Sequence, residues 1–276
     1  MNISYAVRSS IAVAGLLLMA GCGGDDGRTG ANGTGSAAAQ PSSAPAGSRT
    51  LTVFAAASLQ KSFEQIGEDF EVSHPGVTVR FSFGGSSGLV AQLSDGAPAD
   101  VLATANEPTM DKAVAEDLVA GEPTPFVSNT LQIVVPRDNP ARIRSFADLA
   151  ESGAKVVLCA PAVPCGAAAV AVEKAGGIDI KPVSEEQAVT DVLGKVRSGE
   201  ADAGLVYVTD VRAANSSGAS AEVTGLDFPE AESAVNVYPI AALRGATDAR
   251  LAGEFVAATT SVEGQKVLRA AGFAAP

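Results

Sequence analysis

The sequence has few of the residues on which binding to large polar partners depends. It contains no tryptophan, aromatic residues make up only 5% of its 276 residues, and 31 acidic residues outnumber 19 basic ones. The shortage of aromatic rings argues against recognition of nucleic acids or sugars by stacking. The formal net charge of −12 argues against nucleic acids and anionic membrane surfaces. A small anion remains compatible with this composition, because local backbone dipoles outweigh net charge at short range.

Long apolar runs are equally scarce, and the run near the N-terminus, residues 11–20, is too short to cross a bilayer. It leads into Leu18-Met19-Ala20-Gly21-Cys22, which resembles a lipoprotein signal, where the chain is cut before a cysteine that then carries lipid. We expect residues 1–21 to be a lipoprotein signal peptide and Cys22 to be lipidated; an ordinary secretory signal cut nearby is the alternative. Residues 22–48 are mostly small and polar, which predicts a disordered tether. The protein is therefore expected outside the cytoplasm, anchored to the cell membrane by lipid.

Two cysteines remain once Cys22 is set aside. Cys159 and Cys165 are close in the sequence, and in an extracytoplasmic protein such a pair favours a disulfide. Two free thiols or a metal pair are the alternatives. A metal site is disfavoured because the single histidine, His74, lies in a His-Pro-Gly turn.

From residue 51 onward, short apolar segments alternate with amphipathic ones, which is typical of an α/β fold with mainly parallel sheets. We expect strands over 51–55, 77–83, 99–103, 131–135, 155–159, 203–209 and 235–243. Pro239 is expected to break the last strand, which we place at an edge or a crossover. We expect helices from Ser58, from Ser86 or Ser87, over 107–118, 145–149, 166–175 and 185–197, and from Asp248 and Val262.

Two segments place a serine where an apolar strand ends and a helix begins. They are residues 53–59, Val-Phe-Ala-Ala-Ala-Ser-Leu, and 81–88, Phe-Ser-Phe-Gly-Gly-Ser-Ser-Gly. The first N–H groups of a helix lack intrahelical partners and carry partial positive charge, and a serine adds a hydroxyl. Two such turns facing each other would form an anion site without any basic side chain. For an isolated serine, a plain helix-capping role is the alternative.

These segments and three others together resemble a known family. Five motifs resemble those of the molybdate-binding component of an ABC importer, and they occur in the same order with similar gaps. They are residues 53–59, 84–87, 96–100, 163–166 and 204–210. The resemblance covers about residues 50–276, and the five motifs in sequence are more specific than any one of them.

The resemblance implies a two-lobed type II periplasmic-binding-protein fold, in which each lobe is a mainly parallel sheet flanked by helices. It places residues 49–130 and 235–276 in lobe 1 and residues 131–234 in lobe 2. The strands at 131–135 and 235–243 would form a two-strand hinge that lets the lobes close on a tetrahedral oxyanion. Such a protein is a monomeric carrier without a cofactor, not an enzyme, and it delivers its ligand to a membrane permease.

The resemblance also assigns five ligand-binding residues. Ser58 and Ser86 would donate hydrogen bonds through their hydroxyl and N–H groups from the first lobe. Cys165 and Val189 would donate through backbone N–H groups from the second lobe, and Tyr207 through its hydroxyl. For Tyr207 the alternative is a core tyrosine with a satisfied hydroxyl. Molybdenum would be held as an oxyanion, without direct coordination of the metal by the protein.

The chemistry of these residues agrees with that ligand. Molybdate is a dianion with four acceptor oxygens and no proton, so a site of donors alone suits it, whereas protonated phosphate would require an acceptor. Tungstate is expected to bind too, and sulfate or another tetrahedral oxyanion is an alternative because the sequence gives no cavity radius. A serine hydrolase is disfavoured because no histidine follows Ser86 to serve as its base. Asp100 is expected to be a structural or interlobe hydrogen-bonding residue.

Overall fold

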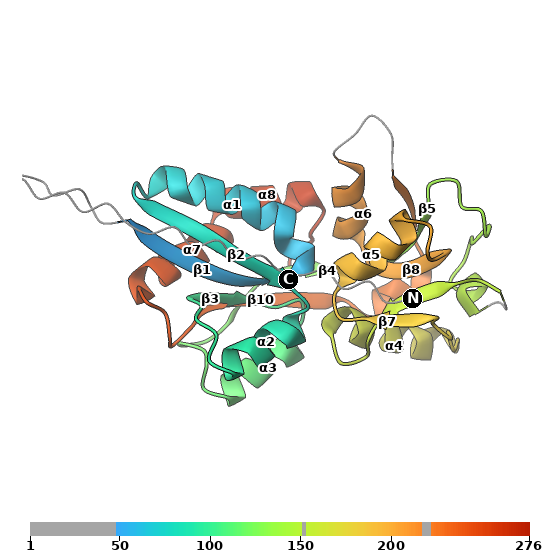
Figure 1. The fold of residues 1–276 in the computed structure, drawn as a ribbon, viewed down its shortest axis with the longest axis horizontal. Coiled ribbons are helices and arrows are strands. Elements are labelled where there is room, and N and C mark those ends of the chain that lie inside the picture. The colour runs from blue at the N-terminus through green and yellow to red at the C-terminus, as the bar shows by residue number, and fades with distance from the viewer. Residues whose placement is uncertain (1–47, 151–152, 217–221) are drawn as a thin grey trace, which may run out of the picture. The chain divides into compact units, whose positions relative to one another are not determined.

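The computed structural model describes residues 48–150, 153–216 and 222–276, which form two five-stranded sheets, each flanked by helices (Figure 1). We call each sheet with its helices a lobe. The predicted signal peptide, Cys22 and nearly all of the predicted tether lie outside the described residues. Within the described ranges, no helix has the length and apolar character needed to span a membrane.

The first sheet has the strand order β2-β1-β3-β10-β4. Its strands are β1 (Arg49–Ala56), β2 (Val77–Gly84), β3 (Val101–Ala103), β4 (Thr124–Asn129) and β10 (Asn236–Ala242). β1 runs parallel to β2 and β3, and β10 runs antiparallel to both β3 and β4. Four strands therefore share one direction and β10 alone is reversed.

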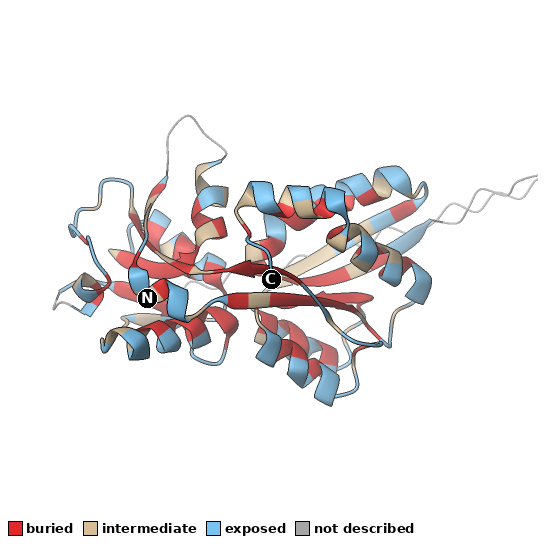
Figure 2. Ribbon diagram, turned by 180° about the vertical axis from the view of Figure 1, so that it is seen from behind, coloured by how far each residue is buried: buried red, intermediate tan, exposed pale blue. Residues whose placement is uncertain are grey.

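Helices cover both faces of this sheet because β1 is apolar on both sides. Leu51 and Val53 pack with α1 (Gln60–Ser73), α7 (Ala249–Thr260) and α8 (Val262–Ala271), whereas Phe54 packs with α2 (Ser86–Ser94) and α3 (Glu107–Ala115). Figure 2 shows the buried strands between helices whose outer faces are exposed. In α1 the apolar residues Phe63, Ile66 and Phe70 are buried against the sheet, as is Leu59 just before the helix.

The second sheet has the order β7-β6-β8-β5-β9 and repeats this pattern. Its strands are β5 (Leu131–Pro136), β6 (Val156–Cys159), β7 (Ser184–Glu186), β8 (Ala203–Tyr207) and β9 (Val223–Leu226). The helices of this lobe are α4 (Pro164–Gly176), α5 (Val189–Arg197) and α6 (Val208–Asn215). Two 3-10 turns, η2 (Ala147–Ala150) and η3 (Pro229–Ser233), also belong to it. β6 is parallel to β7 and β8, and β5 is antiparallel to β8 and β9. The predicted two-lobed α/β class with mainly parallel sheets is confirmed.

The two reversed strands, β5 and β10, are those on which the sequence placed the crossings between lobes. The chain leaves β4 at Asn129, enters β5 at Leu131, and returns from η3 into β10 at Asn236. Of the two expected places for this strand, the edge is wrong, because β10 lies between β3 and β4, whereas the crossover is right, because β10 begins where the chain returns to the first sheet. The expectation that Pro239 breaks the strand is also wrong, because β10 continues through this residue. The register shifts between Tyr238 and Pro239, and such an irregularity accommodates a residue without an N–H.

Several predicted boundaries need correction. The helix expected over 185–197 begins at Val189, after strand β7, and the helix expected over 107–118 ends at Ala115. The strand expected over 203–209 ends at Tyr207, where α6 begins, and strands β4, β7 and β9 were not predicted. The residues Val208-Thr209 are β-branched and so extend the strand pattern, but the carboxylate of Asp210 accepts the Tyr207 N–H at 2.9 Å and starts the helix.

Asp100 is a structural residue of the first lobe. Its carboxylate is buried and accepts two backbone N–H groups, those of Thr52 and Thr247, each at 2.7 Å. Both donors belong to segments of the first lobe, β1 and the approach to α7. Asp100 therefore holds one lobe together and forms neither of these bonds with the other lobe.

Asp210 gives the fold a pH-dependent element. Asp210 is 4% exposed, and burial raises its pKa to about 7. The hydrogen bond from the Tyr207 N–H has the opposite and smaller effect on this pKa, because it favours the charged carboxylate. Between roughly pH 4 and pH 7 the unfolded chain releases this proton while the folded chain retains it. The stability contributed by this group is therefore fully present at acid pH and is lost as the pH rises through about 7.

Replacing this carboxyl by an amide should remove that dependence. Asp210→Asn retains an oxygen for the Tyr207 N–H but has no proton to release, so its stability relative to wild type should rise by roughly 2–4 kcal/mol between pH 4 and pH 8. Urea denaturation of both proteins across this range measures the difference. Parallel stability curves for the two proteins would contradict the assignment.

Candidate functional site

A small cavity lies where the two lobes meet, and we call it the interlobe cavity. It is lined by Ala56, Ala57, Ser58, Gly84, Gly85, Ser86, Ala105, Pro164, Cys165, Val189 and Tyr207. All five residues predicted to bind the ligand are among these. None of the lining side chains in the described part of the protein carries a charge.

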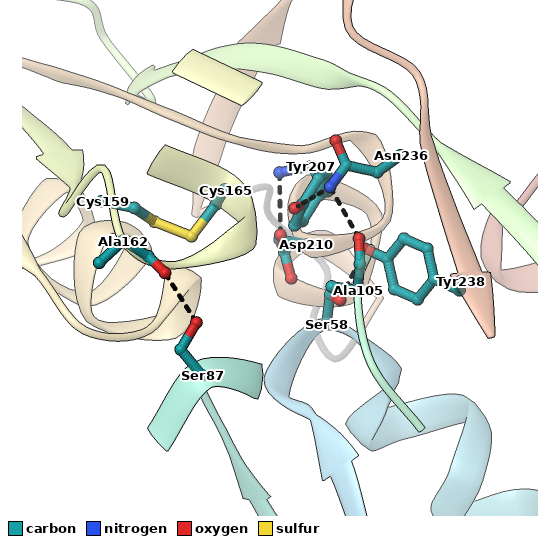
Figure 3. The surroundings of a disulfide bond; sticks show 10 residues. All are labelled: Ser58, Ser87, Ala105, Cys159, Ala162, Cys165, Tyr207, Asp210, Asn236 and Tyr238. Carbon is teal, nitrogen blue, oxygen red and sulfur yellow. Dashed lines mark hydrogen bonds between the residues drawn. A yellow bond between two sulfur atoms is a disulfide. The ribbon is translucent and has the colours of Figure 1, made fainter. Parts of the chain in front are cut away.

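Ser58 reaches the cavity from a tight turn after β1. It is the middle residue of the 3-10 turn η1 (Ala57–Leu59), and Leu59 precedes the first residue of α1. The α-helix expected from Ser58 begins instead at Gln60, because this turn intervenes, and Ser58 does not cap it. Its hydroxyl instead lies 2.9 Å from the Tyr238 hydroxyl (Figure 3).

Ser86 reaches the cavity as the first residue of α2, which is one of the two predicted helix starts, and it is 1% exposed. Its hydroxyl oxygen accepts the backbone N–H of Ala105 at 3.0 Å. An accepting hydroxyl still has its own proton to donate. The bond to Ala105 therefore leaves Ser86 able to donate to a ligand.

The second lobe contributes the first turns of two helices. Cys165 is the second residue of α4, and Val189 is the first residue of α5, with its side chain buried in the core. The structure joins Cys159, at the end of β6, to Cys165 by the predicted disulfide (Figure 3). At Gly166 an added Cβ would lie 1.9 Å from the Ala160 carbonyl oxygen, so the loop before α4 folds tightly over its start.

The three helices that begin at the cavity have first turns without a side-chain cap, a feature that they share with α1. No side chain of the described residues accepts a hydrogen bond at the N-termini of α2, α4 or α5. Helices α3, α7 and α8 begin elsewhere and are capped by Asn106, Asp248 and Ser261. The free N–H groups of three first turns are thus left for another acceptor, and their partial positive charges favour an anion.

Tyr207 completes the lining at the end of β8. It is 1% exposed, its ring packs edge-on against Tyr238 with centroids 5.9 Å apart, and its hydroxyl accepts the Asn236 side-chain amide at 3.0 Å. Burial raises the pKa of Tyr207 well above its usual value, and the neighbouring Tyr238 and Asp210 raise it further. The Tyr207 hydroxyl therefore keeps its proton at neutral pH and remains a donor.

His74 lies away from both serine turns. It follows α1, whose 14 residues span about 20 Å from the Ser58 turn. Its ring stacks on Phe70 with centroids 3.9 Å apart, and its Nδ1 lies 2.9 Å from the Phe70 carbonyl oxygen. The described residues also contain no group of histidine, cysteine and acidic side chains that could hold a metal ion.

A larger groove, of about 620 Å³, lies along α1, α6 and α8. It is lined by basic side chains, Lys61, Arg212 and Lys266, and by acidic ones, Asp69 and Glu263. Of the five predicted ligand residues it includes only Ser58. The mixed charges of this groove, and the single predicted ligand residue in its lining, make the smaller cavity the better match to an anion site.

Sequence reasoning missed the polar residues behind the cavity, which are Asn129, Asn236 and Tyr238. All three are buried, and all lie in strands. Asparagine is depleted in strands, so an asparagine inside the apolar run around Asn236 was the one available signal. Nothing in the sequence placed Asn129 beside it.

The chain has close relatives along its whole length. The sequence pattern of the family described as bacterial extracellular solute-binding protein matches residues 51–274. The molybdate-binding protein ModA of Mycobacterium tuberculosis is 46% identical over 275 residues, covering all of this chain and 98% of that protein. ModA of Escherichia coli is 32% identical over 209 residues, covering 72% of this chain and 79% of that protein.

Solved structures agree in fold. The periplasmic molybdate-binding protein of Azotobacter vinelandii matches with a TM-score of 0.71 and 21% identity, covering 82% of this chain and 99% of that one. The sulfate-binding protein SubI of Mycobacterium tuberculosis matches with a TM-score of 0.68 and 22% identity, covering 82% and 86%. By its sequence pattern and its relatives, the chain belongs to the bacterial extracellular solute-binding proteins.

Proposed function

We propose that this protein binds molybdate, and tungstate as well, outside the cytoplasm and delivers it to the permease of an ABC transporter. The observation that carries this proposal is the interlobe cavity, where uncharged donors from both lobes surround one small space. The relatives that match the whole chain at 46% identity are named as molybdate-binding proteins, which supports molybdate as the anion.

The donors suit a fully ionised oxyanion. Ser58, Ser86 and Tyr207 offer hydroxyl protons, and Ser86, Cys165 and Val189 offer first-turn N–H groups. Hydrogen bonds to a charged acceptor are about twice as strong as neutral ones, so several of them offset the cost of removing a dianion from water. The absence of lysine and arginine from the described lining also allows the anion to leave again, as a carrier requires.

We further propose that lobe 1 comprises residues 49–130 and 235–276, that lobe 2 comprises residues 131–234, and that the crossings between them act as a hinge. Close contacts across the cavity support closure around the ligand. The Ser87 hydroxyl of the first lobe donates to the Ala162 carbonyl of the second at 2.7 Å (Figure 3). At Gly85, an added Cβ would lie 1.9 Å from the Gln187 carbonyl oxygen.

Lipidation of Cys22 and a flexible tether over residues 22–48 belong to the same proposal. A lipid-anchored monomer with a long polar tether could reach a permease in the same membrane. The support is the sequence pattern around Cys22, since these residues lie outside the described structure.

Titration calorimetry with four anions tests the function. Molybdate and tungstate should bind with measurable heat at one site per chain, more tightly than sulfate and far more tightly than phosphate. The physical reason is the cavity's set of donors, which has no acceptor for a ligand proton. Tight binding of another anion with no response to molybdate would overturn the proposal.

Removing the Ser86 hydroxyl tests its role at the site. Ser86→Ala should weaken molybdate binding by roughly 1.5–3 kcal/mol, the scale of one hydrogen bond to a charged group. Ser94→Ala is the matched control, because this serine lies at the opposite end of α2 and donates to the Val90 carbonyl. An affinity unchanged in Ser86→Ala would mean that the hydroxyl serves only the Ala105 N–H.

A methyl group at Gly85 tests closure. The backbone at Gly85 (φ −63°, ψ 129°) suits alanine, so Gly85→Ala should leave each lobe folded while its Cβ collides with Gln187 and holds the lobes apart. We expect at least a tenfold loss of molybdate affinity and a larger radius of gyration in solution with ligand present. Gly88→Ala, whose Cβ would meet no atom within 4 Å, should behave as wild type in both measurements. Equal behaviour of the two variants would refute the closure contact.

A further inference from the structure

Two buried asparagines stand opposite each other where the chain passes between the lobes. Asn129 is the last residue of β4 and Asn236 the first of β10, and the two are register partners. They are 4% and 6% exposed, and each donates a hydrogen bond to a hydroxyl of the second lobe. Both therefore connect the lobes beside the proposed hinge.

The Asn236 amide fixes the direction of the Tyr207 hydroxyl. Its Nδ2 donates to the Ala105 carbonyl oxygen at 2.7 Å and to the Tyr207 Oη at 3.0 Å (Figure 3). A carbonyl can only accept, so the amide nitrogen rather than its oxygen must face Ala105. Because that nitrogen can only donate, Tyr207 accepts from it and keeps its own proton for another partner.

The Asn129 amide is linked to Ser58 through the hydroxyl of Tyr238. Its Oδ1 accepts the Thr130 N–H at 3.1 Å, which orients its Nδ2 toward the Thr209 hydroxyl at 2.8 Å and the Tyr238 hydroxyl at 3.5 Å. A Tyr238 that accepts from Asn129 has its proton available for the Ser58 oxygen, 2.9 Å away. The proton of Ser58 is then left for the cavity.

The third hydroxyl is oriented in the same way by the backbone. The Ala105 N–H donates to Ser86, while the Ala105 carbonyl accepts from Asn236. Each of the three cavity hydroxyls thus has a donor behind it. Burial raises the pKa of both Tyr207 and Tyr238, so neither loses its proton at neutral pH.

We propose that Asn129 and Asn236 are positioning residues that set the cavity hydroxyls to donate, so that the site favours anions without a proton. Asn236 acts on Tyr207 directly, and Asn129 acts on Ser58 through Tyr238. The inference rests on the proposed function, because it concerns how the same cavity discriminates among oxyanions.

Two variants test this inference without touching the proposed ligand residues. Asn236→Asp replaces the donor by an acceptor and should turn the Tyr207 hydroxyl away from the cavity. Tyr238→Phe removes the hydroxyl behind Ser58 and retains the ring that packs against Tyr207 and Phe273. Thr259→Val is the control, because it deletes another fully buried hydroxyl that donates only within α7, to Phe255.

The measurement is the dissociation constant for molybdate, together with that for phosphate from competition, both at pH 8. At this pH both ligands are dianions, but phosphate still carries a proton. Each test variant should weaken molybdate binding roughly tenfold and lower the preference for molybdate over phosphate by a similar factor. The control should change neither value, and circular dichroism checks that every variant is folded.

Different results separate the two proposals. If wild type binds molybdate and both variants do so equally well, the function stands and the positioning role falls. An equal loss of affinity for both anions would also overturn it, since a purely structural role or added negative charge weakens both dianions alike. If Asn236→Asp does not fold, Tyr238→Phe alone decides, because it introduces no charge. Wild type that does not bind molybdate would refute the function itself.

Discussion

The site depends on backbone N–H groups that the protein leaves without internal partners. Helices α2, α4 and α5 begin at the same small cavity, and none has a side-chain cap there among the described residues. Helices α3, α7 and α8, which begin elsewhere, are capped by Asn106, Asp248 and Ser261, whereas α1 also begins without a side-chain cap. The free donors and partial charges of three first turns explain how a chain of net charge −12 could attract a dianion.

The topology brings these helix starts together. In each lobe four of five strands share one direction, and the helices following β2, β6 and β7 begin near the carboxyl ends of those strands. The reversed strands β5 and β10 each lie beside a crossing, and residues at these crossings also supply the donors behind the cavity. The segment that would bend during closure therefore also carries the groups that orient Ser58 and Tyr207.

Local sequence patterns predicted residues that line the cavity but not the buried polar residues behind them. A strand, small residues and a helix follow one another within each serine segment, so Ser58 and Ser86 could be identified directly. The resemblance added Cys165, Val189 and Tyr207, and the structure brings all five to one cavity. Asn129 contacts Tyr238, which is 109 positions away in the sequence, and Asn236 contacts Ala105, which is 131 positions away. Such contacts depend on strand pairing, and β4 was not recognised. The helix after β1 was expected to begin at Ser58 rather than Gln60, because a short 3-10 turn has no sequence signature distinct from a helix start.

The division of donors between lobes bears on how a tightly held anion would be released. Ser58 and Ser86 belong to the first lobe, whereas Cys165, Val189 and Tyr207 belong to the second. Opening would remove one set of donors at once and admit water to the other, so the anion would lose much of its hydrogen bonding in a single motion. A lysine or arginine beside the anion would keep its attraction over a longer distance, because charge–charge energy falls slowly with separation, whereas hydrogen bonds are lost within an ångström or so. A neutral cage therefore couples release to opening more sharply than a charged one would.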